Sequence, residues 1–111
     1  MNRIALVVFG VLVALAAAAT ASAQTPADGQ KVFEAQKCSL CHSVAGKGNA
    51  KGPLDGVGTK LKAADMKLWI TEPAEMSKKH NATRKPAMKS FASLPAADVD
   101  ALVAYLLTLK K

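Results

Sequence analysis

The chain has 111 residues, half of them apolar, and therefore holds at most one small domain. Fifteen basic residues face eight acidic ones, which gives a net charge of +7. All but two of the basic residues are lysines and only 5% of the chain is aromatic, whereas nucleic-acid binders favour arginine and aromatic side chains. The composition thus argues against a nucleic-acid partner. Lysines spread along the chain suit either docking to an acidic protein surface or simple solubility.

The first 23 residues have the pattern of a secretory signal peptide. Arg3 supplies a positive start, residues 4–19 are apolar and uncharged, and Ala21-Ser22-Ala23 is a small-x-small cleavage site. Cleavage there would leave one exported domain, residues 24–111, in the periplasm, with no membrane span and with 14 basic against 8 acidic residues. An uncleaved membrane anchor is the alternative, although the apolar run is shorter than the roughly 18–20 residues that span a bilayer.

The mature chain opens with a predicted helix over residues 28–36, capped by Thr25 or Asp28. Phe33 would face inward. Gly29 lies one turn before Phe33, and a glycine inside a helix costs about 1 kcal/mol relative to alanine. We therefore expect Gly29 to mark a close approach of another helix.

Cys38, Cys41 and His42 follow in the order C-x-x-C-H, which is the attachment signature of c-type haem. Residues three and four apart share one face of a helical turn. Both sulfurs can then reach one edge of a porphyrin and form thioethers, while the His42 imidazole turns under the iron. The motif predicts one covalently attached haem c.

Other uses of two cysteines have less support. A thioredoxin-like redox pair is typical of a βαβ context, and no segment here alternates like a strand. A zinc site needs four ligands, and the chain offers only His80 beyond the motif. Thiol–disulfide exchange remains the main alternative to haem attachment.

Residues 43–60 are predicted to form a loop, because they contain five of the seven glycines and Pro53. Long loops in small domains usually wrap something, here the edge of a haem. Backbone carbonyls around Pro53 could accept a hydrogen bond from Nδ1 of His42 and fix its ring. An ordinary turn proline is the alternative.

Three further segments complete the chain. Residues 63–71 should form a helix with Met66, Trp69 and Ile70 on one face, ended by Pro73. Residues 86–91 should be extended, and the last helix should span about 95–109 with Ser93 as its cap. Its apolar stripe comprises Val99, Leu102, Val103, Leu106 and Leu109.

Taken together, the segments resemble a small bacterial class I cytochrome c over the whole mature chain. The similarity is strongest at Cys38–His42, Gly52-Pro53-Leu54, Trp69-Ile70 before Pro73, Met88–Phe91 and residues 101–106. The resemblance implies an all-α fold of three to four helices around one haem, with the first and last helices crossing near Gly29 and Phe33. It also implies His42 and Met88 as the axial ligands.

The sequence contains two other candidate methionines. Met66 lies on the apolar stripe of a helix, and Met76 follows that helix closely, whereas Met88 lies in a stiff segment before the last helix. Met88 is therefore preferred, with Met76, His80 or an open iron position as alternatives. Lys89 follows Met88 where family members often have proline. Pro53 and Trp69 are the weaker candidates for residues that support the site.

Axial Met/His ligation implies a periplasmic carrier of single electrons and not an enzyme. A dedicated cytochrome c subunit of a periplasmic dehydrogenase or oxidase shares all this chemistry and is the alternative. The expected partners are acidic redox proteins: a dehydrogenase, a reductase or a terminal oxidase. The lysines that should frame the haem edge are Lys37, Lys47, Lys51, Lys78, Lys79, Lys85 and Lys89.

Overall fold

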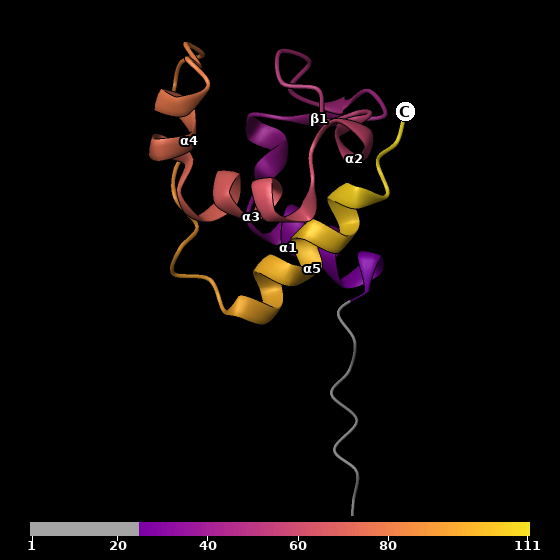
Figure 1. The fold of residues 1–111 in the computed structure, drawn as a ribbon. Coiled ribbons are helices and arrows are strands. Elements are labelled where there is room, and N and C mark those ends of the chain that lie inside the picture. Colours follow the sequence, from indigo (N-terminus) through magenta and orange to yellow (C-terminus); the bar gives the residue numbers. More distant parts are fainter. Residues whose placement is uncertain (1–24) are drawn as a thin grey trace, which may run out of the picture.

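A computed structural model describes residues 25–111, so the predicted signal peptide, residues 1–23, lies outside the described residues. The described elements are the helices α1 (Pro26–Ala35), α2 (Val57–Lys60), α3 (Ala63–Thr71), α4 (Pro73–Lys79) and α5 (Ala96–Leu107), the 3-10 turn η1 (Cys38–Leu40) and the strands β1 (Ser43–Val44) and β2 (Lys47–Gly48) (Figure 1). The all-α prediction is confirmed, with five α-helices in this part of the chain instead of the expected three to four.

Helix α1 begins at Pro26, two residues earlier than predicted, because Thr25 and Asp28 form a capping box. The Asp28 backbone N–H donates to the Thr25 hydroxyl, and the Asp28 carboxylate accepts from the Thr25 backbone N–H, each at 3.2 Å. Hydrogen bonds from Thr25, its hydroxyl first, hold the pKa of Asp28 below its ordinary value. Pro26 is tolerated because the first helical N–H has no partner within the helix.

Helices α1 and α5 cross at Gly29, as the sequence predicts. Gly29 is buried, and a Cβ atom there would collide with the backbone carbonyl of Ala101 and with the Cβ of Tyr105. One turn along, the rings of Phe33 and Tyr105 meet edge to face, with centroids 5.6 Å apart and planes 64° apart. Figure 1 shows α5 passing across α1. The crossing fixes the chain that leads directly into the cysteine motif.

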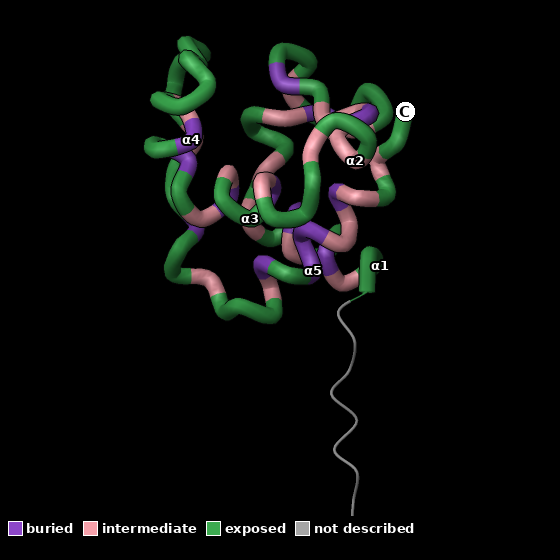
Figure 2. The backbone as a smooth tube through the Cα atoms, in the orientation of Figure 1, coloured by how far each residue is buried: buried purple, intermediate pink, exposed green. Residues whose placement is uncertain are grey.

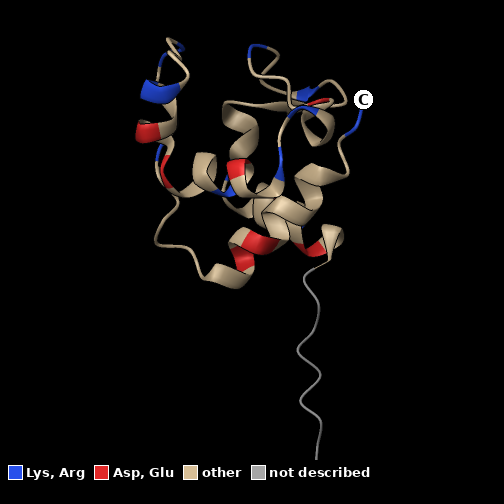
Figure 3. Ribbon diagram, in the orientation of Figure 1, with Lys and Arg blue, Asp and Glu red and all other residues tan. Residues whose placement is uncertain are grey.

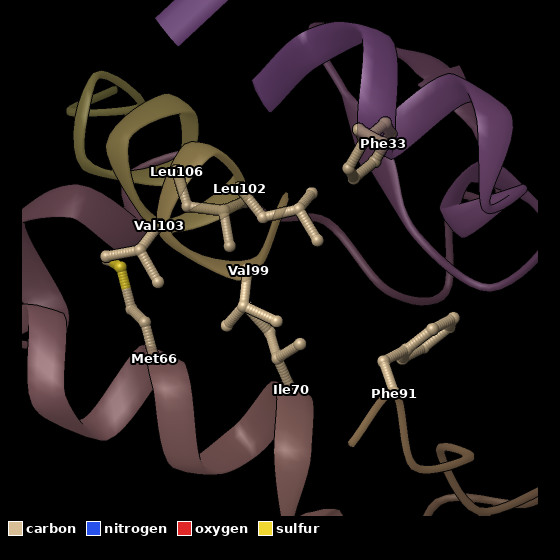
Figure 4. Close-up of a cluster of buried hydrophobic side chains, with 8 residues drawn as sticks. All are labelled: Phe33, Met66, Ile70, Phe91, Val99, Leu102, Val103 and Leu106. Carbon is tan, nitrogen blue, oxygen red and sulfur yellow. The ribbon is translucent and has the colours of Figure 1, made fainter. Parts of the chain in front are cut away.

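The core lies where α1, α3 and α5 meet, and its side chains point into one shared space (Figure 4). Burial is concentrated along α5 and the inner faces of α1 and α3 (Figure 2). The predicted helix 63–71 matches α3, and Met66 on it is only 1% exposed. The buried cluster comprises Phe33, Met66, Ile70, Phe91, Val99, Leu102, Val103 and Leu106.

Residues 43–60 are more ordered than the predicted loop. Strands β1 and β2 form a two-residue antiparallel pair, with Ser43 opposite Gly48. Helix α2 adds one turn and packs against the end of α5, where the Gly58 N–H donates to the Leu109 carbonyl at 2.8 Å. These elements are too short to leave a periodic pattern of apolar residues.

Helix α4 differs from the sequence prediction, in which Pro73 only ends the preceding helix. Pro73 indeed stops α3, but it then occupies the first turn of α4, a position where proline is favoured. Met76 is buried on α4.

The last helix also differs at its start. Helix α5 begins at Ala96 with Pro95 at the capping position, and no side chain caps it, so the prediction of Ser93 as the cap is wrong. Residue 86 lies in a bend, and residues 87–91 form neither helix nor strand, so the predicted loop is confirmed and its extended conformation stays a prediction. Among residues 25–111, no helix combines the length and the apolar character needed to cross a membrane.

The crossing at Gly29 gives a first prediction. Gly29→Ala should lower the free energy of unfolding of the haem-loaded protein by about 1–3 kcal/mol, because the added methyl overpacks against the backbone of α5. Urea denaturation followed by circular dichroism measures the change. Gln30→Ala, on the exposed face of the same helix, is the control and should leave stability nearly unchanged. Equal stability of the two variants would contradict the close crossing.

Candidate cofactor site

The cysteine motif folds into a single tight turn directly after α1. Lys37 adopts the left-handed conformation, with φ 57°, and redirects the chain into η1. The backbone N–H groups of Cys41 and His42 both donate to the carbonyl of Cys38, at 3.1 and 2.9 Å. Both cysteines and His42 are therefore carried by one rigid turn, which is the arrangement that attachment to one edge of a porphyrin requires.

Two adjoining cavities, of about 240 and 510 Å³, open beside this turn. The first, the inner cavity, is lined largely by core side chains, and its wall is almost entirely apolar. More than half of the residues that line the second, the outer cavity, are exposed. Pockets that bind small molecules typically measure about 300–1,000 Å³, so the two cavities together have the size of such a pocket. Five residues line both cavities. The shared residues are Cys38, His42, Trp69, Met88 and Phe91. An apolar slot that presents a thiol, an imidazole and a thioether fits a haem.

His42 is held by its backbone neighbours. Its Nδ1 lies 3.1 Å from the carbonyl oxygen of Gly52, and a carbonyl can only accept, so Nδ1 carries the proton. The other ring nitrogen, Nε2, is then unprotonated in the neutral ring and available to a metal. Burial lowers the pKa of His42; the hydrogen bond to Gly52 opposes this shift, and the charge of Arg84 adds to it.

Gly52 supplies the carbonyl that the sequence placed near Pro53. The same oxygen also accepts from the Ser43 backbone N–H at 3.0 Å, and Leu54 N–H donates to the Ser43 carbonyl at 2.8 Å. Pro53 is exposed between these two bonds. Pro53 stiffens the segment, but the hydrogen bond to His42 comes from Gly52 and not from Pro53.

The three candidate methionines occupy different surroundings. Met66 forms part of the floor of the inner cavity but is fully buried in the core. Met76 is buried on α4 and lines neither cavity. Met88 is half-buried and lines both cavities together with His42.

Trp69 lines both cavities from α3. Its outer side stacks on the imidazole of His80, with ring centroids 5.7 Å apart and planes 29° apart. His80 itself lines neither cavity. The structure therefore brings Trp69 to the candidate site and leaves His80 outside it.

Two charged residues that line the outer cavity make contacts that the sequence does not predict. Arg84 donates through Nη2 to the Cys41 carbonyl at 2.6 Å. The Lys89 ammonium lies 5.1 Å from the centre of the Phe91 ring. The sequence distinguishes Arg84 in one way only: it is an arginine, whereas the other 13 basic residues of 24–111 are lysines.

The surroundings of Cys38 do not favour thiol–disulfide exchange. A reactive thiol needs a lowered pKa. Burial raises the pKa of Cys38, and a backbone hydrogen bond and, to a smaller extent, the charge of Lys89 oppose this effect only in part. The site therefore suits a structural sulfur attachment better than a redox pair.

Comparison with known proteins agrees with this geometry. The Cytochrome c family model matches residues 26–110, almost all of the described chain. A cytochrome c oxidase subunit 2 from Alkalihalophilus pseudofirmus is 31% identical over 91 residues, which cover 74% of this chain and 25% of that protein. The chain thus spans about a quarter of the length of this relative. No solved structure matches the chain.

The family match includes the turn with both cysteines, and Cys38 and Cys41 have the spacing that thioether attachment needs. The cofactor is therefore haem c, and the chemistry of the domain is haem-based electron transfer. The chain belongs to the cytochrome c family.

Proposed function

We propose that this protein is a periplasmic carrier of single electrons in which His42 and Met88 are the axial ligands of the haem iron. One observation carries the proposal: His42 and Met88 line both cavities beside the attachment turn, and Met76 and His80 line neither. Cys38 lines the same cavities and, with Cys41, would hold the haem through two thioethers.

The two ligands have distinct tasks. His42, protonated at Nδ1 and bonded to the Gly52 carbonyl, offers Nε2 in a fixed orientation. Met88 offers a soft thioether, which favours ferrous iron and raises the reduction potential relative to two nitrogen ligands. When bound, the haem supplies a one-electron couple. If both residues bound the iron, no position would be left for a substrate, as a carrier requires.

The rim of the outer cavity supports an acidic partner. Of the described residues that line this cavity, Lys37, Arg84 and Lys89 are positively charged and none is acidic. Leu40, 69% exposed, provides an apolar contact in the same rim. Figure 3 shows acidic residues on α1, α3 and α4 and near the start of α5, and none of them lines this cavity. The positive charge would therefore attract an acidic redox protein to the outer cavity. The two proteins would meet in a small interface that contains water.

Export to the periplasm follows from the leader alone. The charged start, the apolar run and the Ala21-Ser22-Ala23 site support a signal peptide, and removal after Ala23 would release the domain of residues 24–111.

A dedicated haem subunit of a larger redox complex is the second candidate. The relative with 31% identity is named as a subunit of an oxidase and is about four times as long as the matched region. Size-exclusion chromatography of native extract distinguishes the two functions, because a free carrier elutes near its own mass and a subunit elutes with its complex.

Covalent attachment gives a second prediction. Haem should remain with the unmutated protein in acid acetone, and the double variant Cys38→Ala/Cys41→Ala should release it, because both thioethers are lost. The absorbance of the extract measures the result. Ser39→Ala, in the same turn, is the control and should retain haem. Extraction of haem from the unmutated protein would refute the attachment.

Axial ligation gives a third prediction. The ferric protein should show the weak red absorption of sulfur-to-iron charge transfer, and Met88→Leu should abolish it. Met76→Leu, a similar change in a buried position, should leave the band intact. Loss of the band in Met76→Leu with survival in Met88→Leu would move the ligand to Met76.

The charged rim gives a fourth prediction. Lys89→Glu should slow electron transfer with an acidic partner, and the rate of the unmutated protein should fall steeply up to about 0.15 M salt, where the screening length is about 8 Å. Lys110→Glu changes the net charge equally but lies beyond α5, so its rate should change far less. Stopped-flow kinetics measures both rates.

Equal rates for the two charge reversals would mean that the lysines contribute net charge and solubility but no specific docking. The reduction potential and visible spectrum of both variants should stay close to those of the unmutated protein, which separates association from ligation.

A further inference from the structure

The segment that carries Met88 has few ties to the rest of the protein. Within the described chain, no backbone hydrogen bond begins or ends on residues 83–89, which form neither helix nor strand. On one side, Ala82 N–H donates to the Ser77 carbonyl at 2.9 Å. On the other, the Ser90 hydroxyl donates to the Thr71 carbonyl at 2.8 Å. Between these anchors the backbone alone does not fix where Met88 lies.

Arg84 supplies a tie inside this gap. Its Nη2 donates to the backbone carbonyl of Cys41 at 2.6 Å, across 43 positions of sequence. It is the one hydrogen bond in the described chain that joins residues 83–89 to another segment. The acceptor belongs to the attachment turn, directly before His42. The bond therefore connects the segment of one proposed axial ligand to the turn of the other.

The surroundings of this bond are built to admit a guanidinium. Gly52 is buried, and a Cβ atom at this position would collide with both the Arg84 guanidinium and the Cys41 carbonyl. The carbonyl of Gly52 faces His42 Nδ1 at 3.1 Å. Arg84, Cys41, Gly52 and His42 thus form one contiguous group at the edge of the outer cavity.

The chemistry of the side chain also matters. Arg84 is the single arginine in residues 24–111, a stretch with 13 lysines. A guanidinium is planar, always charged and weakly hydrated, so it holds a carbonyl in a fixed direction better than the mobile ammonium of lysine. A charge-assisted hydrogen bond is also stronger than a neutral one.

We propose that Arg84 is a positioning residue, which fastens residues 83–89 to the attachment turn and thereby holds Met88 beside the haem. The proposal rests on the proposed ligation by Met88. It assigns Arg84 no contact with the iron: Arg84 acts by limiting how far the segment can move away.

The test, our fifth prediction, is competition between Met88 and an added ligand. Imidazole titrated into the ferric haem-loaded protein should displace Met88, followed by loss of the red charge-transfer band. Arg84→Ala should bind imidazole about tenfold more tightly, since one exposed charge-assisted bond no longer opposes opening. Lys85→Ala, which removes the same charge one residue away, should bind it like the unmutated protein. Arg84→Lys should fall between.

A second measurement does not depend on the iron. Trypsin cuts after Lys89 more readily when the exposed segment is less restrained, so Arg84→Ala should be cut at this position about tenfold faster than Lys85→Ala. Denaturant midpoints followed by circular dichroism should agree between the two variants, which excludes general destabilisation as the cause.

Equal imidazole affinity and equal cleavage in Arg84→Ala and Lys85→Ala would overturn the proposal. If the unmutated protein lacks the charge-transfer band, ligation by Met88 fails; faster cleavage of Arg84→Ala would then still support the tie itself.

Discussion

The backbone contact between α1 and α5 at Gly29 is the constraint on which the rest of the structure depends. Because Gly29 has no side chain, the carbonyl of Ala101 approaches α1 directly, and Phe33 meets Tyr105 one turn later. Helix α1 then ends only three residues before Cys38. The position of the attachment turn is thus set by a helix whose placement tolerates little variation. The position of this turn therefore fixes one edge of a cofactor that is joined to it, independently of the side chains that contact the faces of the cofactor.

The sequence predicted the parts of the fold that a periodic pattern or a defined motif controls. Helix α3 occupies the expected residues, because Met66 and Ile70 repeat at helical spacing. The sequence does not predict helix α4 or the strand pair, because each is too short for a periodic pattern of apolar residues. The strand pair depends on backbone hydrogen bonds to residues further along the chain. Ser43, for example, bonds to Gly52 and Leu54, and no local pattern of apolar residues records this arrangement.

The candidate site was predictable to a similar extent. The spacing of the motif predicts Cys38, Cys41 and His42, whereas Met88 is implied by the family resemblance and, like His42, stays a proposed ligand. The hydrogen bonds that hold these residues in place could not be predicted. Arg84, for example, donates to the backbone carbonyl of Cys41, and every residue type has such a carbonyl. Gly52 is a partial exception. A side chain at this position would collide with Arg84, so the sequence does contain a glycine where the structure requires one. The reason for this glycine becomes visible only in the three-dimensional contact.

The same residues that build the core also form the wall of the inner cavity. Phe33, Ile70, Phe91, Leu102 and Leu106 belong to the buried cluster and line the cavity as well. A domain of this size buries too little apolar surface for a large margin of stability, so an apolar cofactor in that cavity would complete the core. Binding of a group that only the folded chain holds adds to the free energy of unfolding. Stability and function therefore share one set of contacts, and a change that loosens the core around Phe91 also changes the surroundings of Met88.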